Sequence, residues 1–101
     1  MISIVTVATE KNYKNPIVGL LDKRTMGYFV NLEDAISCVK QNCMDIHEEI
    51  YEYAIIESVE EGLFRYTKPE DVLWFLFDDN TKTYIETTCP KSQERVIGFW
   101  H

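Results

Sequence analysis

Two segments of strand-forming residues separated by five polar residues predict a β-hairpin in the second half of the chain. Residues 72–77 and 83–88 are rich in β-branched and aromatic side chains, which favour strands. The segment between them, Asp78 to Lys82, consists mainly of Asp, Asn and Thr, and such polar residues suit a turn. No other part of the sequence gives as clear a local pattern.

The first strand of this hairpin is apolar on both of its faces. Alternate side chains of a strand point to opposite sides, so Phe75 and Phe77 share one face while Trp74 and Leu76 share the other. Either the strand is central and buried on both sides, or one side is an interaction surface. Trp and Tyr are frequent at binding hot spots, and the best candidates for such a surface are Trp74, Tyr84 and Trp100.

Three further strands follow from β-branched and aromatic composition. Residues 2–8 nearly alternate in polarity, and residues 52–59 form an apolar run that a glutamate and a glycine terminate. We expect the run over 52–59 to be a central strand. Residues 96–100 form a last short strand.

The region between the first strand and the helix has two interpretations. Residues 17–21 and 26–30 are either one strand interrupted near Asp22 to Arg24 or two strands around a turn at that point. We favour the interrupted strand.

A helix is predicted to begin after Asn31. The Asn31 side chain can accept from free backbone N–H groups, and Glu33 and Asp34 in the first turn favour the positive end of the helix dipole. The helix should end within residues 41–44. Apolar residues at helical spacing predict a stripe that faces a sheet: Leu32, Ala35, Ile36, Val39 and Cys43. The opposite side carries Glu33, Ser37, Lys40 and Gln41.

These elements predict an α+β fold, in which one helix packs on one face of a mostly antiparallel sheet of five to six strands, in the order β-β-α-β-β-β. The 101 residues, 46% of them hydrophobic, suit a single domain spanning 1–101. One helix covers only one sheet face. Aromatic side chains or a second copy of the chain, as a homodimer, would cover the other.

Cysteine usage and the first residues favour a cytoplasmic protein with reduced thiols. Cys38, Cys43 and Cys89 form an odd set without a C-x-x-C pair, and we expect them to be small buried residues. The first residues lack a basic segment leading into an apolar stretch, and no apolar run approaches the roughly 20 residues that span a bilayer. We therefore expect no membrane association.

The net charge of −7 is concentrated in the middle of the chain. Residues 31–80 hold thirteen acidic and three basic residues, a net −10, whereas 1–30 carry +2 and 81–101 carry +1. Direct nucleic-acid binding needs clustered Lys and Arg and is therefore not expected. The densest part lacks Lys and Arg from residue 42 to 62 and contains Asp45, Glu48, Glu49, Glu52, Glu57, Glu60 and Glu61.

This acidic run is either a solvated face that keeps the protein in solution or a negative surface for a basic partner. Such a partner would be a protein with a basic surface, for example a nucleic-acid-binding groove that the carboxylates fill in place of phosphates. The second interpretation requires the carboxylates to converge in space.

Catalytic and metal sites are not expected. Cys43, Asp45, His47, Glu48 and Glu49 are all potential metal ligands, but their spacing matches no standard site. Nothing in the sequence brings a cysteine, a histidine and an orienting carboxylate together for nucleophilic catalysis, and the four glycines form no phosphate-binding loop. We predict no cofactor, no metal and no enzymatic activity.

Residues 25–64 resemble small uncharacterised proteins of Gram-positive bacteria and their phages. The resemblance lies in Gly27-Tyr28-Phe29, Leu32 to Ala35, Asn42 to Ile46, Tyr53 to Glu57 and Glu61 to Leu63, and it extends to the Trp74 strand and to Gly98-Phe99. It carries no activity or functional residues. It implies an accessory protein of a mobile element, such as an inhibitor of a host defence system.

The leading hypothesis is a non-enzymatic inhibitor or adaptor that binds a basic protein through its acidic surface. A second hypothesis is a small oligomeric protein that sequesters a nucleotide-like ligand, stacked on Trp or Tyr near Lys11, Lys14, Lys23 and Arg24. A third is a small enzyme whose site the sequence does not reveal.

Overall fold

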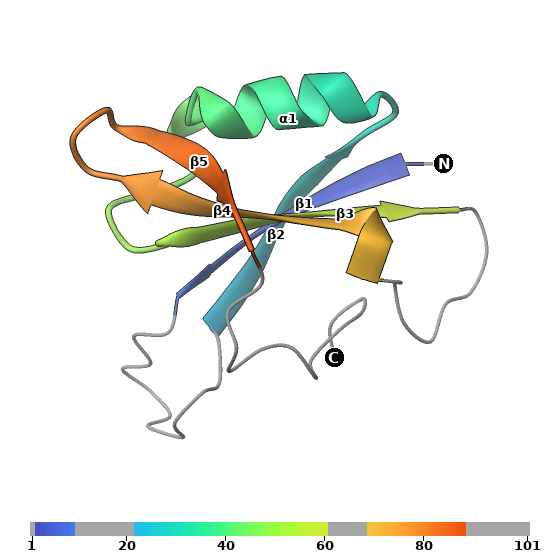
Figure 1. The fold of residues 1–101 in the computed structure, drawn as a ribbon, viewed down its shortest axis with the longest axis horizontal. Helices are drawn as coiled ribbons and strands as arrows, with labels where there is room; N and C mark the ends of the chain where they lie inside the picture. Colours follow the sequence, from blue (N-terminus) through green and yellow to red (C-terminus); the bar gives the residue numbers. More distant parts are fainter. Residues whose placement is uncertain (1, 10–21, 61–68, 89–101) are drawn as a thin grey trace.

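The computed structural model describes residues 2–9, 22–60 and 69–88, which form a five-stranded antiparallel sheet with one α-helix on one face (Figure 1). The strand order is β2-β1-β3-β4-β5. This confirms the predicted α+β fold and the central position of β3. The elements are β1 (Ile2–Thr9), β2 (Asp22–Phe29), α1 (Leu32–Lys40), β3 (Tyr53–Val59), β4 (Val72–Asp78), β5 (Thr83–Thr87) and the 3₁₀ turns η1 (Cys43–Asp45) and η2 (Pro69–Asp71).

The helix α1 begins as predicted. Asn31 has extended backbone angles, and its side-chain oxygen accepts a hydrogen bond from the Glu33 N–H at 2.8 Å. Ala35 and Val39 are fully buried against the sheet, and Ile36 packs beside them. The prediction that the two end positions of the stripe face the sheet was wrong. Leu32 and Cys43 are exposed, because Leu32 lies in the first turn and the helix ends before Cys43.

The core occupies both faces of the sheet. On the helix side it contains alternate residues of the inner strands, such as Val7, Ile56 and Phe75. On the face away from α1, Ile55 and Trp74 pack with smaller or half-buried neighbours. The strand β4 is therefore buried on both faces at its middle, although it is the fourth strand of the sheet order and not the central one.

The expected interruption near Asp22 to Arg24 was wrong. These three residues belong to β2 and pair with the end of β1, from Thr9 to Val7. The irregularity lies two residues later, at Met26, where the register shifts between the pairs Val5–Gly27 and Thr6–Thr25. Because β2 lies at the edge of the described sheet, its polar residues satisfy their backbone groups through β1 without having to be buried. The strands expected over residues 17–21 and 96–100 lie outside the described residues.

Candidate functional site

The segment from Asn42 to Glu52, which we call the acidic loop, connects α1 to β3. It consists of successive tight turns, with backbone hydrogen bonds such as Asp45 N–H to the Asn42 carbonyl at 3.0 Å and Ile50 N–H to the His47 carbonyl at 2.9 Å. Its residues with positive φ are Asn42, Met44, Asp45, Glu48 and Glu49, with values between 48° and 60°. Asn and Asp tolerate this left-handed conformation, whereas Met and Glu adopt it rarely.

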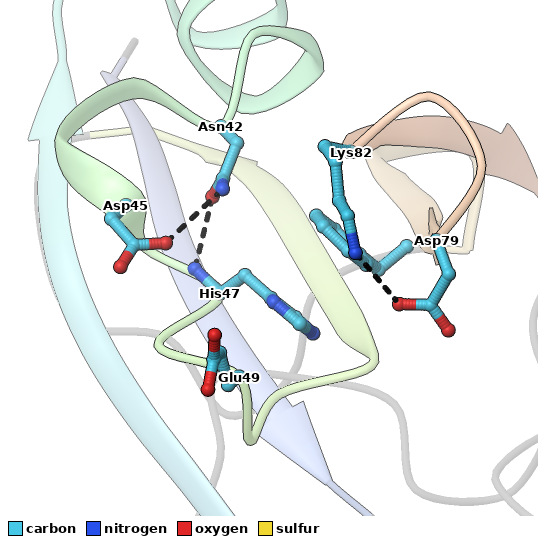
Figure 2. Close-up of a pocket in the computed structure, with 7 residues that line it drawn as sticks. Asn42, Asp45, His47, Glu49, Asp79 and Lys82 are labelled. Atoms are coloured by element: carbon cyan, nitrogen blue, oxygen red, sulfur yellow. Dashed lines mark hydrogen bonds and ion pairs between the residues drawn. The ribbon is translucent and has the colours of Figure 1, made fainter.

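The Asn42 side chain joins the first turns of the loop (Figure 2). Its oxygen accepts the His47 backbone N–H at 3.0 Å, and its amide nitrogen donates to the Asp45 carboxylate at 3.2 Å. Asn42 is therefore suited to its position twice, by its tolerance of positive φ and by these two hydrogen bonds.

Three contacts hold the acidic loop against the sheet. Ile46 is buried in the core on the helix side. The His47 ring stacks on Phe77 of β4, with ring centroids 3.5 Å apart and an angle of 5° between planes. The hydroxyl of Tyr84 in β5 donates to the Tyr51 carbonyl at 2.6 Å. Burial, together with the nearby carboxylates of Glu52 and Asp45, raises the pKa of Tyr84 above its usual value, so this hydroxyl stays protonated as a donor.

A cavity of about 410 Å³, which we call the acidic cleft, lies between the acidic loop and the β4–β5 turn. Figure 2 shows Asp45, His47 and Glu49 on the loop side and Asp79 and Lys82 on the turn side. Asn42 and Phe77 complete the lining. The Lys82 ammonium is 3.9 Å from the Asp79 carboxylate, and both side chains are largely exposed.

The chemistry of the acidic cleft suits a cationic group. The lining includes three carboxylates, those of Asp45, Glu49 and Asp79, and one ammonium, that of Lys82, so it carries excess negative charge. The aromatic rings of Phe77 and His47 add an apolar surface against which an alkyl chain can pack. The volume falls in the range of roughly 300–1,000 Å³ that is typical of ligand pockets.

The acidic residues predicted to form one surface are divided between separate places. Asp45, Glu48 and Glu49 are exposed in the acidic loop, and Glu52 at its end is half-buried and accepts the Thr9 hydroxyl at 2.7 Å. Beyond them, Glu57 is fully buried on the face away from α1, Glu60 is exposed after the far end of β3, and Glu61 lies outside the described residues.

The prediction that all these carboxylates converge on one surface was therefore wrong. A strand rises about 3.3 Å per residue, so β3 separates Glu52 from Glu60 by about 25 Å. The Glu57 side chain is fully buried in β3, so its carboxylate is not accessible to a partner. The part of the prediction that remains consists of Asp45, Glu48 and Glu49.

Folding also brings basic residues to these carboxylates. Arg24 of β2 lies 3.2 Å from Glu48, a surface ion pair that the sequence separation concealed. Lys23 interacts with Glu57, although burial outweighs this attraction and lowers the Lys23 pKa. The second hypothesis placed a nucleotide-like ligand near Lys23 and Arg24, yet both of these side chains have acidic neighbours. Lys11 and Lys14 lie outside the described residues.

The aromatic surface predicted from Trp74 and Tyr84 was wrong. Trp74 is 6% exposed and packs in the core on the face away from α1, and Tyr84 is 1% exposed on the helix side. Tyr84 is buried because it packs in the helix-side cluster with residues such as Phe75, and Trp74 is buried because it packs with Ile55 and Ala8 on the other face. Trp100 lies outside the described residues.

Sequence reasoning missed half of the acidic cleft. Asp79 and Lys82 appeared only as turn residues, and Phe77 only as part of the hairpin core. The predicted hairpin was the one feature of the sequence that could have indicated them, because a hairpin turn projects beyond the ends of its two strands. The position of the acidic loop beside that turn depends on the packing of Ile46 in the core, which the sequence pattern does not predict.

The thiols differ from the expectation of buried cysteines. Cys43 is exposed and Cys38 is half-buried, while Cys89 lies outside the described residues. No three His, Cys, Asp or Glu side chains gather in a group able to hold a metal ion within residues 2–9, 22–60 and 69–88. In the same residues, no helix is long and apolar enough to cross a membrane.

Comparison with protein-family models, with curated proteins and with solved structures finds no match to this chain. The resemblance to small proteins of Gram-positive bacteria and their phages therefore stays a prediction.

Proposed function

We propose that this chain is a non-enzymatic binding protein, an inhibitor or adaptor of the mobile-element kind, whose acidic cleft receives basic side chains of a protein partner. The observation that supports this most directly is the meeting of carboxylates from two distant segments, Asp45 and Glu49 from the acidic loop and Asp79 from the β4–β5 turn, around one cavity. Glu48 of the same loop is paired with Arg24, so these three carboxylates carry the proposal without it.

The shape of the acidic cleft favours a long basic side chain over a flat cationic surface. An Arg or Lys side chain can place its charged head among the carboxylates while its methylenes contact the Phe77 ring. Arg is the better fit, because its planar guanidinium can donate hydrogen bonds to two carboxylates at once and stacks on aromatic faces. The Lys82–Asp79 contact, at 3.9 Å between exposed groups, is weak enough for an incoming guanidinium to displace it.

The test uses two short peptides of equal length, one arginine-rich and one lysine-rich, titrated into the protein by NMR and calorimetry. A triple variant, Asp45→Asn with Glu49→Gln and Asp79→Asn, removes the three negative charges of the acidic cleft and keeps hydrogen-bond acceptors. If each exposed charge contributes about 0.5 kcal/mol, the triple variant should bind the arginine-rich peptide about tenfold more weakly.

The matched control removes the same number of charges elsewhere. Glu60, Glu70 and Glu86 are exposed and do not line the acidic cleft, so Glu60→Gln with Glu70→Gln and Glu86→Gln should weaken binding by less than about threefold. Equal loss in both triple variants would mean that only the net charge matters and would contradict a specific cleft. Affinity that does not fall with added salt would contradict an electrostatic site altogether.

A further inference from the structure

The strand β5 carries an exposed apolar side chain that continues a row of large side chains across the sheet. Ile85 of β5 lies directly opposite Leu76 of β4, and their side chains are 50% and 42% exposed. Both lie on the sheet face away from α1, because Trp74, two residues before Leu76, packs on that face. Tyr53 of β3 lies opposite Leu76 and is half-buried, so the row runs from β3 to the edge at β5.

The two edge strands of the described sheet, β2 and β5, differ in how their edges are protected (Figure 1). Edge strands carry backbone N–H and C=O groups that can pair with another strand, and natural edges are often blunted by basic side chains, proline or a bulge. β2 contains Lys23 and Arg24 and has a register shift at Met26. β5 has the sequence TYIET, without a basic residue or proline, and its register with β4 is continuous. The β5 edge is therefore suited to pair with a further strand.

A second copy of β5 fits this edge in antiparallel orientation about a two-fold axis. With Tyr84 opposite Tyr84 of the second copy, Lys82 lies opposite Glu86 of that copy, and the symmetry repeats this pair. Both side chains are exposed. The Lys82 ammonium lies 3.9 Å from the Asp79 carboxylate, and its three N–H donors allow it to bond a second carboxylate as well. The edge is therefore complementary in charge to a copy of itself.

The same register brings the exposed apolar side chains of the two copies together. Ile85 lies opposite Thr83 of the second copy and diagonal to its Ile85, so Ile85 and Leu76 of both copies form one apolar cluster on the face away from α1. In the neighbouring register, with Ile85 opposite itself, the two Glu86 carboxylates lie diagonal to each other and Lys82 no longer lies opposite Glu86. Charge therefore favours the register centred on Tyr84.

We propose that this chain forms a two-fold symmetric homodimer through β5, which joins the two sheets into one continuous antiparallel sheet with both helices on the same face. Backbone hydrogen bonds between the β5 strands, the apolar cluster of Leu76 and Ile85, and two Lys82–Glu86 ion pairs hold the copies together. This arrangement differs from the homodimer expected from the sequence, in which the second copy covers a sheet face. It does not depend on the proposed function, because it involves no other protein.

Sedimentation equilibrium over a series of chain concentrations measures the dissociation constant of the dimer. Lys82→Glu and Glu86→Lys should each raise this constant at least about tenfold, because each reversal places like charges opposite each other twice. The double variant, Lys82→Glu with Glu86→Lys, exchanges the two charges and keeps the net charge of the chain. It should restore the wild-type constant to within about threefold.

The matched control for Glu86→Lys is Glu70→Lys, which reverses an exposed charge in η2, outside β5. It should change the dissociation constant by less than about threefold. Ile85→Lys tests the apolar part of the contact and the edge itself. Because Ile85 is exposed, this variant should keep the circular dichroism spectrum of the wild type, whereas its sedimenting mass should become that of one chain.

Hydrogen exchange locates the contact in the unaltered protein. The backbone amides of β5 should exchange more slowly as the chain concentration rises, whereas those of the other edge strand, β2, should not change. A wild-type mass equal to one chain at millimolar concentration would overturn the proposal. A dimer that persists unchanged in Ile85→Lys and in both single reversals would place the interface elsewhere and overturn it too. Single reversals that weaken the dimer without recovery in the double variant would exclude the Lys82–Glu86 pairs.

Discussion

Replacing Tyr84 with Phe removes one atom from the contact that holds the acidic loop to β5. The Tyr84 hydroxyl is buried and donates to the Tyr51 carbonyl at 2.6 Å, while the ring itself packs in the core against Phe77. The variant retains the ring and loses only the hydrogen bond. Such a loss costs about 1–2 kcal/mol when the acceptor stays away from water, so the melting temperature should fall by about 10 °C.

The same hydroxyl makes stability depend on alkaline pH. Because burial raises the pKa of Tyr84 in the folded state, the folded protein retains this proton at a pH where the unfolded chain, with a pKa near 10, has lost it. Above pH 10 the unfolded state therefore binds fewer protons, and the free energy of unfolding decreases by about 1.4 kcal/mol per pH unit from this group. The stabilisation is complete below pH 10 and is lost above it.

Urea unfolding of the wild type and of Tyr84→Phe between pH 7 and 11 measures both effects. The difference in free energy of unfolding should be about 1–2 kcal/mol at pH 7 and should shrink towards zero near pH 11, since Phe has no proton to lose. Tyr28→Phe is the matched control, because Tyr28 is 67% exposed, and it should change stability by less than about 0.5 kcal/mol. A difference between wild type and Tyr84→Phe that stays constant up to pH 11 would refute this reasoning.

Two further predictions concern the position of the acidic loop and the start of the helix. Ile46→Ala removes a buried anchor of the loop and should lower the free energy of unfolding in urea by about 2–4 kcal/mol. The NMR amide signals of Asp45 and Glu49 should shift more than those of β1. Shifts spread evenly over the protein would contradict an anchoring role. Asn31→Ala should cost about 1 kcal/mol because the Glu33 N–H loses its acceptor, whereas Asn31→Ser should cost less than half as much; equal losses for Ala and Ser would mean that the cap bond does not contribute.

The parts of the fold that sequence patterns predicted are those determined by local chemistry. The hairpin followed from two runs of β-branched and aromatic residues around a polar turn, and the helix start followed from the capping side chain of Asn31. The strand over Asp22 to Arg24 was missed because an edge strand is held by backbone hydrogen bonds to its neighbour, which polar residues make as well as apolar ones. Local composition does not reveal such pairing.

The site was predicted less well, because it depends on which segments meet. The acidic run could be counted in the sequence, but β3 separates its two ends, and burial removes Glu57 from the surface. Arg24 reaches Glu48 across 24 positions of sequence, and Asp79 joins Asp45 from another turn. Each of these pairings is a consequence of sheet order, which the sequence leaves undetermined.

The backbone of the acidic loop explains why its geometry follows from tertiary contacts. Met44, Glu48 and Glu49 each adopt a left-handed conformation that costs about 1 kcal/mol for a side chain of their kind, or roughly 3 kcal/mol together. Burial of the Ile46 side chain contributes about 2 kcal/mol, and the hydrogen bonds of Tyr84 and Asn42 about 1 kcal/mol each, which offsets that strain. Without the Ile46 side chain the two hydrogen bonds alone fall short of the strain, so the loop should relax in Ile46→Ala, and the acidic cleft should lose its shape before the sheet unfolds.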